Sequence, residues 1–134
     1  MSAAPVLLDT NVASFLHGGK PEAALYHHAL RGRRAAVSFQ TAAELLSGAD
    51  MRGWGGQRRR GLASFLADTT ILYPDMDMLR TWSHLRAALV KKGLTVATAD
   101  MWVGATALRH DLTLLAHDGV FRQIAGLKLV CHAP

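Results

Sequence analysis

The sequence predicts an α/β fold, in which a central, mostly parallel sheet of about four to five strands has helices on both faces. Two observations carry this prediction. Short apolar runs alternate with helical segments along the whole chain, an arrangement typical of parallel sheets joined by right-handed crossovers. The 134 residues are also 50% hydrophobic and 19% charged, which favours a buried core over a disordered chain. We expect one domain spanning residues 1–134.

The first predicted strand is the apolar run 6–8, which is followed directly by Asp9. An apolar run of this length with no polar alternation indicates a strand that is buried on both faces. A polar turn is expected at Thr10 and Asn11. After a pair of glycines, residues 21–30 are predicted to form a helix because proline stands at their first position.

The middle of the chain contains a second predicted strand at 35–39 and a helix at 41–49. The segment 53–61 is rich in glycine and arginine and interrupts the apolar pattern. Because glycine disfavours regular structure, this segment is predicted to be the most mobile part of the chain. A further helix is expected at 62–67.

The last third of the chain begins with a predicted strand at 70–73, which ends at a proline. A long helix is predicted at 77–92, because apolar residues recur there at spacings of three and four. Its expected core face consists of Met78, Trp82, Leu85 and Leu89. The remaining predicted elements are a helix at 98–110, a strand at 112–116, a short helix at 118–124 and a strand at 127–131.

The charge balance points to a phosphate-bearing partner. Fifteen Lys and Arg against 10 Asp and Glu give a net charge of +5, and 11 of the 15 cations are arginine, the residue best suited to phosphate. The single cysteine, Cys131, excludes an internal disulfide and a cysteine-based zinc site. The first residues lack the pattern of a signal peptide or membrane span, so we expect a cytoplasmic protein that does not enter a membrane.

Four acidic residues stand at positions where chemistry is expected. Asp9 and Asp118 follow predicted strands, and ligands of parallel sheets bind at the carboxyl ends of the strands. Asp100 lies in the first turn of a predicted helix, where the helix dipole favours an anion. Glu44 is surrounded by small and apolar residues, with no cation within four positions, so its carboxylate needs a partner elsewhere in the fold.

Each of these acids also has a purely structural interpretation. Asp9 is a suitable cap for a following helix, Asp100 an ordinary first-turn acid, and Asp118 a turn residue before glycine. Glu44 is equally compatible with a partly exposed helix position. The sequence alone leaves both interpretations open.

In order and spacing, the four acids resemble the acidic signature of the PIN-domain ribonucleases, and in particular the VapC-type toxins of bacterial toxin–antitoxin pairs. The resemblance extends from about residue 6 to residue 130, and its most specific block is DMWVGATAL, which begins at Asp100. It implies a three-layer α/β/α PIN-like fold. It also implies a metal-dependent endoribonuclease that pairs with a small antitoxin and forms a homodimer.

Clustered carboxylates need a cation, because like charges raise one another's pKa. Oxygen ligands suit Mg²⁺, for which Mn²⁺ can substitute. We assign Asp9, Asp100 and Asp118 to the metal, and Glu44 to orient or deprotonate the attacking water. The resemblance implies that Asn11 holds Asp9 or a bound water, although a turn or cap role is as well supported.

The basic segment offers a candidate RNA contact. Arg58, Arg59 and Arg60 form its densest part, with Trp54 available to stack on a base; the alternative is a solvated helix face. Five apolar residues are candidates either for an antitoxin groove or for the core: Phe15, Leu16, Leu62, Phe65 and Leu66. Three further functions remain open for the whole chain: an RNA-processing nuclease without an antitoxin, a small-molecule phosphohydrolase or phosphotransfer domain, and a non-catalytic RNA-binding module.

Overall fold

The computed structural model describes residues 4–134, so residues 1–3 of the expected domain lie outside the described part. A five-stranded sheet with strand order β3-β2-β1-β4-β5 forms its centre, and every pairing is parallel. The strands are β1 (Val6–Leu8), β2 (Ala35–Ser38), β3 (Thr70–Leu72), β4 (Leu114–Ala116) and β5 (Leu129–Cys131). The predicted parallel α/β sheet is confirmed, with strand ends that differ from the predicted ones by up to two residues.

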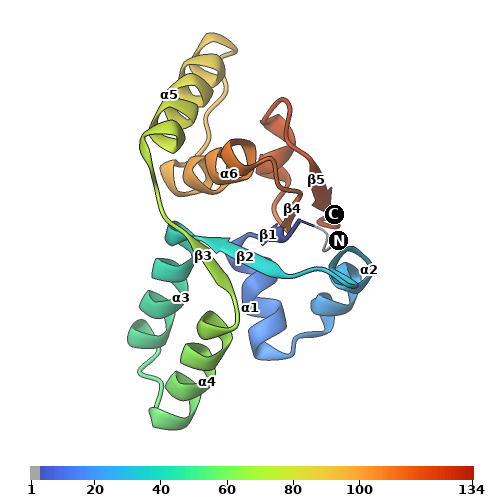
Figure 1. Cartoon of the computed structure of the whole chain (residues 1–134), viewed down its shortest axis with the longest axis vertical. Helices are drawn as coiled ribbons and strands as arrows, with labels where there is room; N and C mark the ends of the chain where they lie inside the picture. Colours follow the sequence, from blue (N-terminus) through green and yellow to red (C-terminus); the bar gives the residue numbers. More distant parts are fainter. Residues whose placement is uncertain (1–3) are drawn as a thin grey trace.

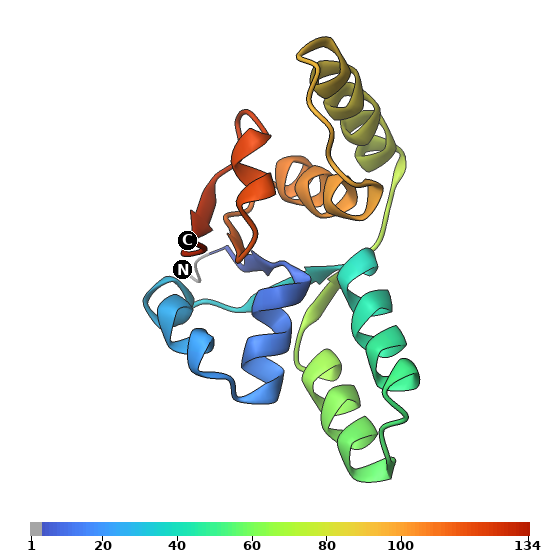
Figure 2. The ribbon, with the colours of Figure 1, turned by 180° about the vertical axis from the view of Figure 1, so that it is seen from behind.

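Helices cover both faces of this sheet, which gives the three layers seen in Figures 1 and 2. One face carries α1 (Thr10–Gly18), the 3-10 helix η1 (Pro21–Tyr26), α2 (His27–Leu30), α3 (Phe39–Met51) and α4 (Gly56–Ala67). The other face carries α5 (Met76–Lys91), α6 (Thr98–His110) and the 3-10 helix η2 (Gly119–Gln123). The three-layer α/β/α architecture is therefore confirmed.

The alternation of side chains along β1 separates the two cores. Val6 and Leu8 pack with the α1 and α3 side of the sheet, whereas Leu7 packs with the α5 and α6 side. All three are fully buried, and complete burial of a leucine contributes about 2 kcal/mol. The run without polar alternation thus reflects a strand covered by helices on both faces.

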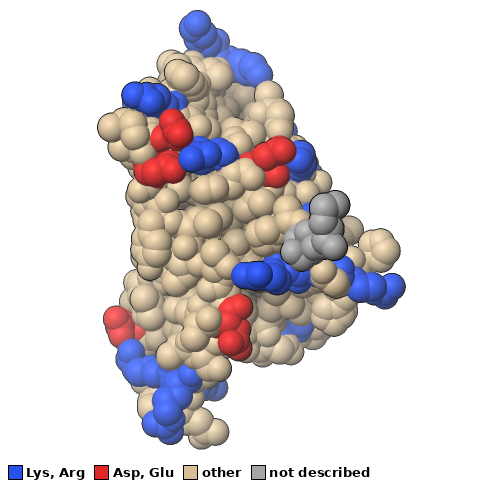
Figure 3. Space-filling model, in the orientation of Figure 1, with Lys and Arg blue, Asp and Glu red and all other residues tan. Residues whose placement is uncertain are grey.

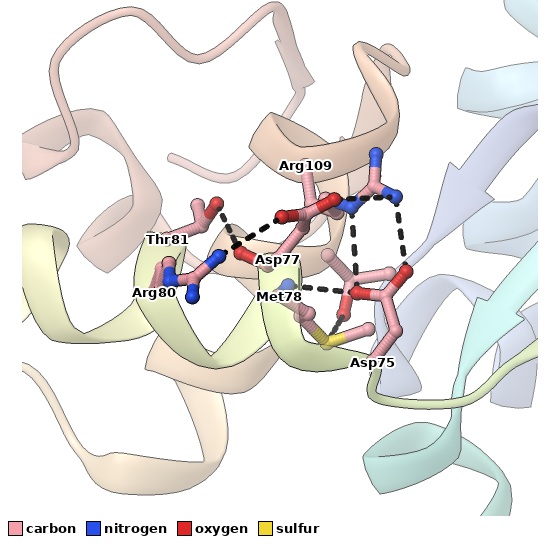
Figure 4. Close-up of polar contacts among 7 residues, drawn as sticks. Asp75, Asp77, Met78, Arg80, Thr81 and Arg109 are labelled. Atoms are coloured by element: carbon pink, nitrogen blue, oxygen red, sulfur yellow. Dashed lines mark hydrogen bonds and ion pairs between the residues drawn. The ribbon is translucent and has the colours of Figure 1, made fainter.

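The helix pair α5 and α6 contributes to the core on its side of the sheet and is held together at one end by an ion-pair cluster (Figure 4). Asp75 caps α5 by accepting from the Met78 backbone N–H at 2.8 Å. The Arg109 guanidinium, on α6, reaches Asp75 at 2.9 Å and Asp77 at 3.4 Å. The predicted core face of α5 is confirmed: Met78, Leu85 and Leu89 are buried, and Trp82 packs against them.

Two predictions about local structure are wrong. Thr10 and Asn11 belong to the first turn of α1, because Asp9 caps that helix. The segment 53–61 is mostly helical, because α4 begins at Gly56 and the turn before it is short. Only Gly53 requires a positive φ, of 63°; beyond it the arginines favour a helix and override the glycines.

No helix within residues 4–134 combines the length and apolar character needed to cross a membrane.

Candidate active site

The acidic residues lie where the order of the strands in the sheet reverses. The chain proceeds from β1 to β2 and β3 on one side, and continues to β4 and β5 on the other. Such a switch point opens a crevice at the carboxyl ends of the two central strands. Asp9 directly follows β1, and Asp118 lies two residues beyond β4, so the two residues stand on either side of this crevice.

Two helices bring the remaining acids to the same place. Glu44 lies on α3, and Asp100 lies in the first turn of α6. A cavity of about 170 Å³ opens between these elements. Its lining consists of Asp9, Thr10, Asn11, Glu44, Asp100, Val103, Asp118 and Phe121. The fold therefore gathers all four predicted acids, and Asn11 with them, around one cavity.

Asp9 is the most buried of these acids, with 4% of its surface exposed. One carboxylate oxygen accepts from the Val12 backbone N–H at 2.7 Å and caps α1. The other accepts from the His117 backbone N–H at 3.1 Å. Burial raises the pKa of Asp9 to about 6, the two N–H donors oppose this shift, and the nearby carboxylates add to it. The structural interpretation of Asp9 is confirmed, because its carboxylate caps α1, and the same residue also lines the cavity.

The other three acids are more accessible than Asp9. Burial raises the pKa of Asp100, and repulsion from Asp118 and Glu44 raises it further. Asp118 is exposed and accepts from the Val120 backbone N–H at 2.9 Å. Gln40, one turn before Glu44 on α3, donates to the Glu44 carboxylate at 2.9 Å. These carboxylates repel one another across the cavity, and a divalent cation would relieve that repulsion.

The donor set fits a magnesium or manganese ion that keeps part of its water shell. Within residues 4–134, no three His, Cys, Asp or Glu side chains converge closely enough to hold an ion by themselves. Mg²⁺ commonly takes only one or two protein carboxylates and fills its octahedron with water and substrate phosphate. Four carboxylates around one small cavity, two of them with a raised pKa, match this kind of site.

A larger groove of about 630 Å³ runs from the acidic cavity between α1, α3 and α4, which lie side by side in Figure 2. Thr10, Asn11 and Glu44 line both hollows. Farther from the acids, the groove is lined by cationic and aromatic side chains, which are Lys20, His17, Arg52, Trp54 and Arg58.

The three consecutive arginines of α4 have different surroundings. Arg58 lines the groove, with its guanidinium 5.6 Å from the centre of the Trp54 ring. Arg59 is already bonded, to Asp50 at 2.6 Å and to the Trp54 carbonyl at 2.7 Å, so it ties the α3–α4 turn together. Arg60 is exposed.

The five apolar residues considered for an antitoxin groove mostly belong to the interior. Leu62 is 2% exposed and lies in the core beneath α1 and α3. Leu16, Phe65 and Leu66 pack against the same core. The ring of Phe15 contacts His117, with ring centres 5.2 Å apart. The core interpretation therefore holds for Leu62, whereas the other four are partly buried and fit either interpretation.

Several residues around the site were not singled out from the sequence. The Thr10 hydroxyl donates to the Thr41 hydroxyl at 3.1 Å and joins α1 to α3. Gln40 has a signal that could have been read, since its spacing of four residues from Glu44 places both on one helix face. His117 contributes a backbone N–H, which no side-chain pattern predicts.

Comparison with known proteins gives an independent assignment. The family model described as "PIN domain" matches residues 6–127. A sequence comparison with curated proteins gave no match.

Solved structures with the same fold include several toxin–antitoxin complexes. VapBC2 of Rickettsia felis, bound to a DNA fragment from its promoter, matches with a TM-score of 0.84 and 23% identity over 96% of this chain and 98% of that chain. VapBC-1 of nontypeable Haemophilus influenzae matches with a TM-score of 0.80, and DNA-bound VapBC of Salmonella typhimurium with 0.78. Both of these are 25% identical and cover 96% of this chain and 98% of theirs. The chain therefore belongs to the PIN-domain family, and its fold is the one found in VapBC toxin–antitoxin complexes.

Proposed function

We propose that this protein is a metal-dependent endoribonuclease that hydrolyses RNA phosphodiester bonds. We further propose that it acts in the cytoplasm as the toxin of a toxin–antitoxin pair, inhibiting translation or growth, and that residues 1–134 form a single PIN domain. The observation that carries the proposal is the convergence of four carboxylates on one cavity that opens into a cationic groove. The match to the PIN-domain family supports the nuclease activity.

The four acids have two different roles in this proposal, metal binding and activation of water. Asp9, Asp100 and Asp118 would hold Mg²⁺, or Mn²⁺ in its place, directly or through water. When bound, such an ion supplies positive charge that activates water and stabilises the phosphate in the transition state. Glu44 orients or deprotonates the attacking water, and the hydrogen bond from Gln40 keeps its carboxylate in one orientation.

Asn11 is placed to contact water or substrate. It lines both the cavity and the groove, and its side chain is exposed. The two oxygens of Asp9 already accept hydrogen bonds from backbone N–H groups of Val12 and His117. We therefore assign Asn11 to a hydrogen bond with a bound water or an RNA oxygen in preference to a bond with Asp9.

The groove provides a path for the RNA backbone away from the acids. Arg52 and Arg58 supply charge for phosphates along the groove, and Trp54 supplies a ring on which a base can stack. Arg60 is available at the surface for a further phosphate. Arg59 supports this path indirectly, because its bonds to Asp50 and to the Trp54 carbonyl hold the turn that presents Trp54.

Partners are inferred from the related structures, which are VapBC complexes that in two cases are bound to DNA. By analogy, we propose an antitoxin whose segment covers the acidic cavity, and a homodimer of this chain. Purification of the protein together with its neighbouring gene product checks this part. A small protein bound in a fixed ratio is expected, and its absence would favour an RNA-processing nuclease without an antitoxin.

The central experiment measures cleavage of structured RNA with Mg²⁺, with Mn²⁺ and with a chelator. Cleavage that requires a divalent ion is expected, and Asp100→Asn should reduce it by about a hundredfold or more, because the substitution removes a ligand charge. Asp111→Asn is the matched control, because Asp111 ends the same helix in an exposed position with a φ of 53°, which asparagine tolerates.

Three outcomes would contradict the proposal. Full cleavage by Asp100→Asn in a preparation free of other nucleases would remove the assigned site. Hydrolysis of small phosphate esters without RNA cleavage would indicate a phosphohydrolase. RNA binding without any cleavage would indicate a non-catalytic module.

A further inference from the structure

The hydroxyl of Tyr26 lies at a point where three segments distant in sequence meet. Tyr26 ends η1 and is fully buried. Its oxygen lies 2.6 Å from the Ala116 carbonyl, at the end of β4, and 2.8 Å from Nδ1 of His117. The backbone N–H of His132, just beyond β5, donates to the same oxygen at 3.1 Å. A single buried hydroxyl thus has three polar partners.

The chemistry of these partners determines the direction of each hydrogen bond. The Ala116 carbonyl can only accept, so the Tyr26 hydroxyl donates its one proton there. Burial raises the pKa of Tyr26, which keeps that proton in place. The hydroxyl oxygen then only accepts, from His132 N–H and from His117. Nδ1 of His117 must therefore carry a proton, which selects one tautomer of the neutral imidazole.

The His117 residue held in this way is in contact with the acidic cavity. Its backbone N–H donates to the buried carboxylate of Asp9 at 3.1 Å. Asp118, which lines the cavity, is the next residue along the chain. The His117 ring also meets Phe15 edge to face, at an interplanar angle of 78°. The hydroxyl and the aromatic ring together leave the 116–118 turn little freedom.

We propose that Tyr26 is a positioning residue of the acidic site. Its hydroxyl holds the 116–118 turn so that the His117 N–H stays on Asp9 and the Asp118 carboxylate stays at the cavity. The group acts through this turn and does not line the cavity itself. The proposal rests on the proposed function to the extent that these acids are taken to bind a divalent cation.

Tyr26→Phe tests the proposal, because it removes the hydroxyl and keeps the buried ring. Mn²⁺ affinity, measured by electron paramagnetic resonance without RNA, is expected to fall about tenfold, which is the lower end of the effect of groups that orient metal ligands. In cleavage assays the Mg²⁺ concentration for half-maximal rate should rise, and kcat at saturating Mg²⁺ should change less. Tyr73→Phe is the matched control, because Tyr73 is 68% exposed and should keep the wild-type Mn²⁺ affinity.

A second measurement needs no metal and starts from the wild-type protein. Long-range nitrogen–proton NMR correlations of the wild-type imidazole, recorded under alkaline conditions, should show the His117 proton on Nδ1. In Tyr26→Phe the proton should move, at least in part, to Nε2. This shift tests the inferred direction of the hydrogen bond, whereas the Mn²⁺ affinity tests the positioning role, because a merely structural role would alter stability and leave that affinity unchanged.

The proposal is overturned if wild-type His117 carries its proton on Nε2, because the inferred hydrogen-bond directions are then incorrect. It is also overturned if folded Tyr26→Phe binds Mn²⁺ as tightly as the wild type. If Tyr26→Phe does not fold, the wild-type tautomer still tests the proposal, because a proton on Nε2 would overturn it. Dependence of Mn²⁺ binding on Tyr26 in a protein that cleaves no RNA would instead contradict the proposed function and leave the positioning role intact.

Discussion

Asp9 shows how one residue serves the fold and the site together. Its carboxylate caps α1 by accepting a hydrogen bond from the Val12 N–H. It also accepts a hydrogen bond from the His117 N–H, just beyond β4. Burial raises its pKa to about 6, so without a cation the ionised form is destabilised. Because this carboxylate is shielded from water, a nearby metal ion would strongly stabilise its ionised form.

The first prediction concerns the pH dependence of stability. The pKa of Asp9 is about 6 in the folded protein, against 3.8 for the unperturbed group, so the folded state holds the proton more tightly. The stabilisation from the protonated form is present below about pH 4 and is lost as the pH rises through about 6, a loss of about 3 kcal/mol. Asp9→Asn should not show this loss, while its amide oxygen can still cap α1.

The measurement is urea unfolding of both proteins in chelator at several pH values between 4 and 7. The difference between their unfolding free energies isolates Asp9 from the other titrating groups. If the two proteins show the same change with pH, Asp9 is not the buried acid described here.

At the scale of elements, neighbouring arginines of the α3–α4 hairpin have different roles: one faces the groove and another holds the hairpin together. Its tip carries the arginines that Figure 3 shows gathered at the lower end of the molecule. Arg59 faces back to the hairpin and bonds to α3, whereas Arg58 faces the groove. Alternate directions for neighbouring residues follow from the helix, in which consecutive side chains lie about 100° apart.

The second prediction contrasts two single substitutions on this hairpin. Arg58→Gln should weaken RNA binding and reduce the slope of log affinity against log salt by about 0.7 to 0.9, the value for one lost phosphate contact. Arg59→Gln should lower the unfolding free energy by about 1 kcal/mol or less, because its ion pair is partly exposed, and should leave the salt slope unchanged.

Binding by fluorescence anisotropy at several salt concentrations, together with thermal unfolding, separates these effects. Equal salt slopes for wild type and Arg58→Gln would show that this face of α4 is simply solvated.

For the whole molecule, the net charge of +5 is the sum of acidic and basic residues that lie in different places. Carboxylates converge on a small cavity at the switch point of the sheet, while cations line the groove that leaves it. Under the proposed function, the cavity would hold the divalent cation and the groove the polyanion. Because the acids repel one another, an ion that binds there would also stabilise the fold, so metal binding and stability would be coupled.

The third prediction follows from this coupling. An ion that binds only the folded state at about a hundredfold above its Kd adds about 2.7 kcal/mol to the unfolding free energy. Mn²⁺ should therefore raise the Tm of the wild type and of Asp111→Asn, and should have a much smaller effect on Asp100→Asn. Differential scanning fluorimetry across a Mn²⁺ titration checks this, and an equal shift in all three proteins would place the ion elsewhere.

Elements whose signal is local were predictable from the sequence. The apolar run of β1 and the three-and-four spacing of α5 follow from residues that are near one another in the chain. The segment 53–61 was mispredicted because packing of α4 at Leu62 overrides the low helix propensity of glycine. The predicted strands β4 and β5 also start too early in the sequence, because hydrogen-bonded pairing with neighbouring strands decides where a strand starts.

The candidate site divides in the same way. Asp9, Asp100 and Asp118 were visible as residues that follow strands or begin a helix, and Glu44 as a carboxylate with no cation near it in the sequence. The fold places all four around one cavity. The backbone partners of Asp9 and Asp118 were not visible, because a backbone N–H has no sequence signature. Behind the site, the hydrogen bond between Tyr26 and Ala116 joins residues that are 90 positions apart.

The sequence by itself determined the α/β class and the parallel sheet, because hydrophobic periodicity is a property of neighbouring residues, and it indicated the four acids as candidates. Only the tertiary structure decided how deeply Asp9 is buried, which arginine of α4 faces the groove, and that a tyrosine holds the turn before Asp118. These properties depend on groups that folding brings together from distant positions in the chain, and local sequence patterns do not predict such contacts.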